Sequence, residues 1–167
     1  MKSLTLANLR KRAIFVASEV IPLFEIYSKL IHPNLKAPHL RNEKSFALSK
    51  PSLFIKDEKG LLLVHNFELY NILKITDISY EMLEHEVLYS EINADYFIFE
   101  LAFYELIQVI ARYPKLVNLG HSYEALNESL SPEVCEELFG KNSFPKSMFY
   151  NLINFPERTF YNRMKKN

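Results

Sequence analysis

The stretch that decides the fold runs from Asn93 to Arg112 and reads NADYFIFELAFYELIQVIAR. After Asp95, its strongly polar positions recur at a spacing of about four residues and so form one narrow stripe on a helix. These positions are Glu100, Glu105, Gln108 and Arg112. The rest of the circumference is apolar, which is typical of a helix covered on several sides. We therefore predict a buried central helix over residues 93–112, ended by Pro114.

Length and composition indicate an ordered globular protein. The chain has 167 residues, of which 49% are hydrophobic and 3 are glycine, which is enough for one domain or one domain plus a small appendage. The single Cys135 excludes an internal disulfide and is expected in the core. Glu19 and Pro22 interrupt the apolar residues that follow Arg10-Lys11-Arg12, too early for a signal core or a membrane span. We therefore expect a cytoplasmic protein without a membrane partner.

The elements around the central helix predict a predominantly helical α+β fold. Helical spacing from Thr5 to Ile31 indicates an amino-terminal helical arm, kinked or split at Pro22. Residues 34–50 contain few apolar side chains and are predicted to be a long surface connection. Two apolar runs in residues 52–65 flank a charged, glycine-containing turn and predict a hairpin. A helix is expected over 66–73, a further strand over 84–89 and a short helix over 121–128. The predicted sheet is therefore the hairpin plus one further strand, packed on the central helix, in a core of residues 1–128.

Residues 129–167 are predicted to form a carboxyl-terminal three-helix unit packed on that core. The first helix has four agreeing boundary signals, namely the cap Ser131, Pro132 at the first position, Glu133 at the positive end and the terminal Gly140. The other two helices are expected over residues 145–153 and 156–165. The first two helices and their turn have the proportions of a helix-turn-helix, whose second helix presents polar side chains to the major groove of DNA.

This unit supplies the candidate binding residues. On the second helix the candidate DNA contacts are Lys146, Ser147, Tyr150 and Asn151. Beyond it, four cations could neutralise phosphates, namely Arg158, Arg163, Lys165 and Lys166. An ordinary packed helical cap is the alternative interpretation.

The order strand, strand, helix, strand, helix over residues 50–153, with Gly60-Leu61-Leu62-Leu63-Val64 ahead of a helix, resembles the ParB and sulfiredoxin-like family. The family's members join this fold to a helix-turn-helix for chromosome or plasmid partition. Where the family has a Gly-x-x-Arg-Arg phosphate-binding turn, this chain has His65-Asn66-Phe67-Glu68-Leu69-Tyr70, without glycine or arginine. The resemblance therefore implies no catalytic residue here, and we expect no cofactor.

Charge is strongly segregated along a chain of zero net charge. Residues 1–50 carry 9 Lys or Arg against 3 Asp or Glu, and residues 141–167 carry 6 against 1. Residues 77–111 carry 8 carboxylates and no Lys or Arg. This asymmetry is compatible with basic ends that bind a polyanion, that lie against the acidic middle, or that pair with the acidic region of another copy.

Other arrangements of chemical interest do not predict a catalytic or metal site. On a strand, His85 points away from Glu84 and Glu86, so these carboxylates are expected to form a solvated face. The five histidines lack ligand spacing, and no nucleophile elbow or glycine-rich loop is present. Glu100 and Glu105 would have a raised pKa only if they faced the core.

We therefore predict a non-enzymatic DNA-associated protein, a regulator or partition-like factor, that uses the basic carboxyl-terminal unit. The alternative is a protein-interaction module or assembly subunit, forming a homo-oligomer or binding another protein through a surface rich in Phe and Tyr.

Overall fold

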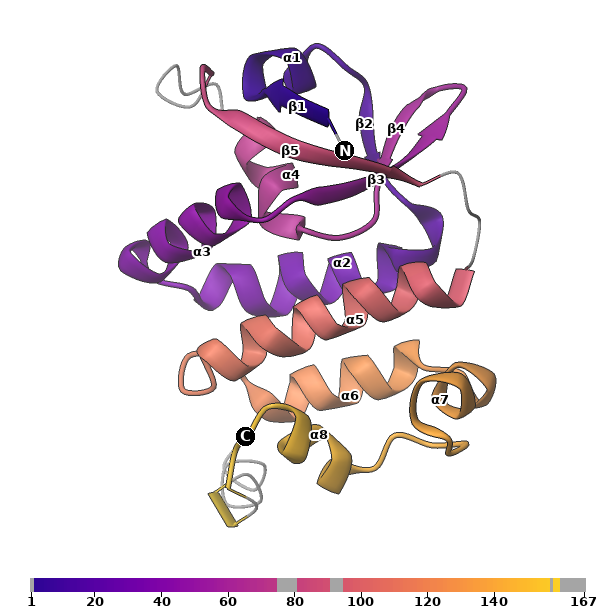
Figure 1. Ribbon diagram of the computed structural model, residues 1–167. Coiled ribbons are helices and arrows are strands. Elements are labelled where there is room, and N and C mark those ends of the chain that lie inside the picture. The colour runs from indigo at the N-terminus through magenta and orange to yellow at the C-terminus, as the bar shows by residue number, and fades with distance from the viewer. Residues whose placement is uncertain (1, 75–80, 91–94, 157, 160–167) are drawn as a thin grey trace. The chain divides into compact units, whose positions relative to one another are not determined.

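The computed structural model describes residues 2–74, 81–90, 95–156 and 158–159, of which 95 and 96 are described in their backbone alone (Figure 1). The chain groups into two compact units. The first comprises Met1–Ile21 and Ala37–Ala102, and the second comprises Pro22–Lys36 and Phe103–Asn167. The segment predicted as a separate carboxyl-terminal unit is thus grouped with residues 22–36 and 103–128.

The first unit is built on a mixed sheet that has five strands within the described residues, in the order β1-β5-β3-β4-β2. The strands are β1 (Lys2–Thr5), β2 (Ile14–Val16), β3 (Ser52–Asp57), β4 (Gly60–Leu63) and β5 (Glu84–Ser90). The β1–β5 and β3–β4 pairs are antiparallel, whereas β2–β4 and β3–β5 are parallel. The predicted hairpin and the predicted strand near 84–89 are therefore confirmed, and so is the predominantly helical α+β class.

Three helices of this unit share one apolar core with the sheet. They are α1 (Leu6–Arg10), α3 (Ala37–Ser49) and α4 (Phe67–Lys74). Buried side chains from the helices, including Leu9, Ala47 and Leu69, form one cluster with strand residues such as Phe54 and Val87. Because alternate strand residues point to the same face, the buried residues of β4 and β5 identify the face that carries this core.

Two predictions for the first fifty residues are wrong. The arm predicted as helical from Thr5 to Ile31 begins at the last residue of β1 and contains the whole of β2, because these strands of four and three residues pair with distant β5 and β4. Strands this short carry too little periodicity to be recognised. The predicted surface connection over 34–50 contains α3, which was missed because its fully buried side chains are few, namely Glu43 and Ala47.

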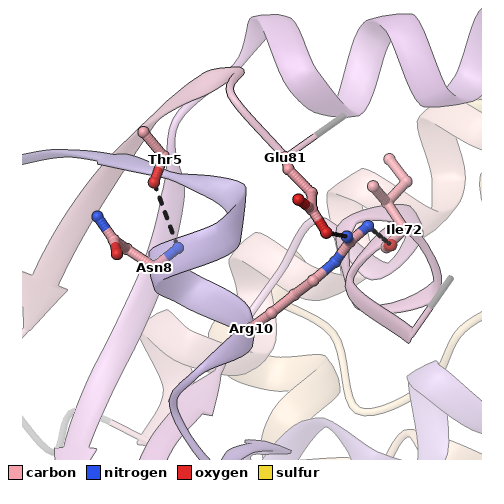
Figure 2. Close-up of polar contacts among 5 residues, drawn as sticks. All are labelled: Thr5, Asn8, Arg10, Ile72 and Glu81. Carbon is pink, nitrogen blue, oxygen red and sulfur yellow. Dashed lines mark hydrogen bonds and ion pairs between the residues drawn. The ribbon is translucent and has the colours of Figure 1, made fainter. Parts of the chain in front are cut away.

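Helix α1 is tied to the rest of the unit by Arg10 (Figure 2). The guanidinium of Arg10 donates from Nη2 to the Ile72 carbonyl at 3.2 Å, and its Nη1 lies 3.7 Å from Oε1 of Glu81. Thr5 Oγ1 caps the same helix by accepting from the backbone N–H of Asn8. Arg10 belongs to the basic amino-terminal segment and Glu81 to the acidic middle, so at this point the two oppositely charged segments pair within the chain.

The central helix α5 (Asp95–Arg112) forms as predicted. Its side chains at Ile98, Ala102, Phe103, Leu106 and Ile110 are almost fully buried. Along the polar stripe, Glu100 and Glu105 are half-buried, while Gln108 and Arg112 are exposed. The residues up to Ala102 belong to the first unit and those from Phe103 to the second.

The second unit is helical within the described residues. It contains most of α2 (Ile21–Ile26), the π-helical turn η2 (Tyr27–Ile31) and the 3-10 turn η3 (His32–Asn34), followed by α6 (Leu119–Ser129), α7 (Pro132–Phe139) and α8 (Lys146–Leu152). The predicted helices at 121–128, 132–139 and 145–153 are confirmed to within two residues. The predicted helix over 156–165 lies largely outside the described residues. No helix in the described part of the chain is long and apolar enough to cross a membrane.

A buried polar chain joins four segments of the first unit. Ser52 Oγ lies 2.8 Å from Nε2 of His85, and the side-chain amide of Asn66 donates both to Ser52 Oγ at 2.7 Å and to the Ala47 carbonyl at 2.8 Å. Burial lowers the pKa of His85, while the Leu48 carbonyl and Glu86 oppose this shift and the charge of His65 adds to it. In its neutral form, the imidazole of His85 can accept a hydrogen bond from the Ser52 hydroxyl at Nε2. In its protonated form, it would be a buried charge.

The lowered pKa of His85 predicts that the protein loses stability as the pH falls. Below the ordinary histidine pKa of about 6.5, the unfolded chain binds a proton that the folded imidazole resists, so the free energy of unfolding decreases. Above about pH 6.5 both states are neutral and the contribution is fully present. Urea unfolding at pH 7.5 and 5.5 should show a larger difference for the wild type than for His85→Gln. The exposed-site control His121→Gln should keep the wild-type pH dependence, and an unchanged difference in His85→Gln would contradict this explanation.

Gly60 is predicted to be required in the β3–β4 turn. Its φ is +152°, and a Cβ there would meet the Ala13 carbonyl, which accepts from the Leu61 N–H. Gly60→Ala should therefore lower the free energy of unfolding by about 3 kcal/mol, from conformational strain and a backbone clash together. The matched control is Gly140→Ala, where φ is +63° but the Cβ would meet open space, so the loss should be about 1 kcal/mol. Equal losses in urea unfolding would contradict the clash.

Candidate nucleic-acid interface

Helix α7 begins and ends at the residues expected from the sequence. Ser131 Oγ accepts from the Val134 N–H at 3.3 Å, and Pro132 occupies the first turn. Gly140 adopts the left-handed conformation with φ of 63°, and its N–H donates to the Glu136 carbonyl at 2.8 Å. Cys135 is buried as predicted, and burial raises the pKa of its thiol. The first helix of the predicted helix-turn-helix is therefore sharply bounded.

The turn between α7 and α8 is held by an aromatic cluster centred on Phe144. This side chain is 1% exposed. Its ring centroid lies 5.4 Å from Phe139, 5.8 Å from Phe103, 5.9 Å from Tyr123 and 6.2 Å from Phe149. Since these rings come from α5, α6, α7 and α8, Phe144 fixes the turn to these four helices.

Helix α8 brings the four candidate contacts on the second helix together. Residues 146 and 150, 147 and 150, and 147 and 151 are three or four positions apart, so the four side chains share one side of the helix. Lys146 and Asn151 are exposed, whereas Ser147 and Tyr150 are half-buried. The Nζ of Lys146 lies 5.7 Å from the ring centroid of Tyr123. The short helix therefore presents one cation and several hydrogen-bonding groups at its surface.

The cations expected beyond α8 are described only in part. Arg158 is exposed and lies in a helical turn, where the Thr159 N–H donates to the Pro156 carbonyl at 2.9 Å. Arg163, Lys165 and Lys166 lie outside the described residues. The prediction that these four cations neutralise DNA phosphates therefore stays a prediction.

The turn itself adds candidate contacts that the sequence analysis did not select. Lys141, Asn142 and Ser143 are all exposed. Their position directly before the second helix of a helix-turn-helix is the signal that could have identified them. A hollow of about 280 Å³ adjoins the other end of α8, lined by Tyr150, Asn151, Asn154, Phe155 and Pro156.

The outer face of α7 carries the opposite charge. Glu133, Glu136 and Glu137 are exposed, and the hydrogen bond to Ser131 lowers the pKa of Glu133. Carboxylates on this face disfavour phosphate contact. A DNA-binding surface on this unit would therefore be restricted to the turn, α8 and the residues that follow.

Two other groupings of polar residues in the first unit can be compared with the requirements of a catalytic or metal site. Ser52 and His85 stand at the distance of a nucleophile and its base, yet they are 0% and 1% exposed, so substrate has no access. Glu84 and Glu86 are exposed on the face opposite to His85, as expected. The described part of the chain contains no group of three or more His, Cys, Asp or Glu that could hold a metal ion.

Comparisons with protein-family models, with curated proteins and with solved structures gave no match for this chain.

Proposed function

We propose that this protein is a non-enzymatic DNA-associated protein that contacts DNA through the α7–α8 turn and helix α8. The observation that carries the proposal is the helix-turn-helix arrangement around Phe144, in which α8 presents Lys146, Ser147, Tyr150 and Asn151 on one side. A short helix held rigidly by its neighbours, with polar groups on its free side, is the arrangement that enters a major groove.

The charges around this unit support one orientation on DNA. Lys141, Lys146 and Arg158 are exposed cations on the turn, on α8 and after it, respectively. The three carboxylates of α7 would face away from the phosphates, since like charges repel. DNA would then approach from the side of α8 and the residues after it.

Each side chain has a chemically distinct role in this proposal. Lys146 and Arg158 neutralise phosphates, and Tyr150 and Ser147 can bond to phosphate oxygens through their hydroxyl groups. Asn151 carries an amide, the group that pairs with the N6 and N7 edge of adenine. Asn151 is therefore the residue to which we assign base discrimination.

A role as a regulator or partition-like factor in the cytoplasm is part of the same proposal. It is supported by the order β3, β4, α4, β5, α5 ahead of the helix-turn-helix, which is the order on which the resemblance to the ParB and sulfiredoxin-like family rests. The absence of glycine and arginine from residues 65–70 places nucleotide hydrolysis outside the proposal.

The proposal predicts DNA binding that weakens steeply with salt. The wild type should bind duplex DNA at about 50 mM salt, and Lys146→Ala and Arg158→Ala should each reduce the slope of log K against log salt by about 0.9. Asn151→Ala should leave that slope unchanged and reduce discrimination between sequences. Fluorescence anisotropy over about 50 to 200 mM salt measures both quantities.

The matched control for these variants is Lys115→Ala, another exposed lysine of the second unit that precedes α6. It should bind DNA like the wild type. Absence of wild-type binding at low salt, or an equal loss in Lys115→Ala and Lys146→Ala, would overturn the proposal.

A protein-interaction role is the second candidate, favoured by large apolar side chains at the surface of the first unit. They are Phe15, Ile21, Phe46, Met82, Leu83 and Phe97, between 40% and 82% exposed. Such side chains are enriched at the centres of interfaces.

If this surface mediates self-association, light scattering during size-exclusion chromatography should show a mass above 19.7 kDa that rises with concentration. Met82→Ser, at the most exposed of these positions, should lower that mass. A monomer at all concentrations would count against the homo-oligomer.

A further inference from the structure

Tyr123 of α6 contacts both the turn and the second helix of the proposed DNA-binding unit. Its hydroxyl donates to the Phe144 carbonyl at 2.9 Å. Its ring stacks on Phe144 with centroids 5.9 Å apart and lies 5.7 Å from the ring of Phe149 in α8. One side chain therefore fixes the turn by a hydrogen bond and α8 by ring packing.

The same ring faces the ammonium group of Lys146. The Nζ lies 5.7 Å from the ring centroid, which is within the distance of about 6 Å at which a cation is attracted to the electron-rich face. A free lysine side chain samples many rotamers, and ordering it has an entropic cost. Contact with Tyr123 reduces this cost before any ligand arrives.

We infer that Tyr123 is a positioning residue that directs Lys146 to a backbone phosphate and not to a base edge. The inference rests on the proposed DNA-binding function. Lys146 stands at the first position of α8, and its ammonium is held toward α6, beside the short helix. In a complex with α8 in the groove, the phosphates flank the helix, whereas the bases lie beneath it. Helix α6 thereby becomes a third component of the DNA-contacting surface.

A double-mutant cycle between Tyr123→Leu and Lys146→Ala tests the inference. If the ring positions the ammonium, Tyr123→Leu should weaken DNA binding about two- to five-fold more in the wild-type background than in Lys146→Ala. The loss should be the same for all DNA sequences, because phosphates carry no sequence information. Equal losses in both backgrounds would show that Tyr123 acts only through stability and would overturn the inference.

Two controls separate the ring from other effects. Tyr123→Phe removes the hydrogen bond to the Phe144 carbonyl and keeps the ring. The coupling between the ring at position 123 and Lys146 should therefore persist. Lys141→Ala removes a turn lysine for which the described structure shows no ring contact, so Tyr123→Leu should weaken binding equally with and without it. A coupling to Lys141 as large as that to Lys146 would contradict a specific contact.

A second measurement needs neither DNA nor a variant. In the NMR spectrum of the wild type, the ε-methylene protons of Lys146 should be shifted upfield by the Tyr123 ring current, and those of Lys141 should not. Unshifted Lys146 protons would overturn the positioning role even if DNA binds. Shifted protons in a protein that does not bind DNA would instead overturn the proposed function and leave the contact in place.

Discussion

The burial of Phe144 is the constraint on which the candidate site depends. This ring sits in a six-residue connection between two short helices, and neither α7 nor α8 is long enough to be stable by itself. Contacts with Phe103, Phe139, Tyr123 and Phe149 supply the tertiary packing that both helices need. Burial of one aromatic side chain contributes about 1.5–3 kcal/mol, so the geometry of the turn follows from where this ring is held.

The elements that could be predicted are those whose signals are local. Helix α7 carries a cap, a first-turn proline and a terminal glycine within ten residues, and α5 carries an apolar pattern over eighteen. The β3–β4 hairpin has its charged turn between two apolar runs. In each case the residues that decide the structure are neighbours in sequence, so the pattern can be recognised without knowledge of the tertiary fold.

The missed elements owe their structure to distant partners. β1 pairs with β5 residues 79 to 85 positions away, and β2 pairs with β4 residues 47 positions away. Leu6 and Leu9 have a helical spacing because both belong to α1, which lies between β1 and β2 in the sequence. Helices α7 and α8 were predicted better than the sheet for the same reason: they and the turn between them are contiguous in sequence. The exposed turn residues were overlooked because contacts were sought on the second helix and after it, and not in the turn before it.

The described residues include ion pairs both between and within the oppositely charged segments of the chain. Arg10 and Glu81 join the two kinds of segment, whereas Lys29 pairs at 3.1 Å with Glu25 four residues earlier, inside the basic segment itself. Within α7 and α8, the two signs are separated by helix: carboxylates lie on α7, and Lys146 lies on α8 beside Tyr123. An exposed ion pair contributes less than about 1 kcal/mol, so folding alone gives little reason for this separation. Under the proposed function, this separation would direct DNA to the side of α8, because Lys146 lies there beside Tyr123 of α6 and the carboxylates that repel phosphate lie on α7.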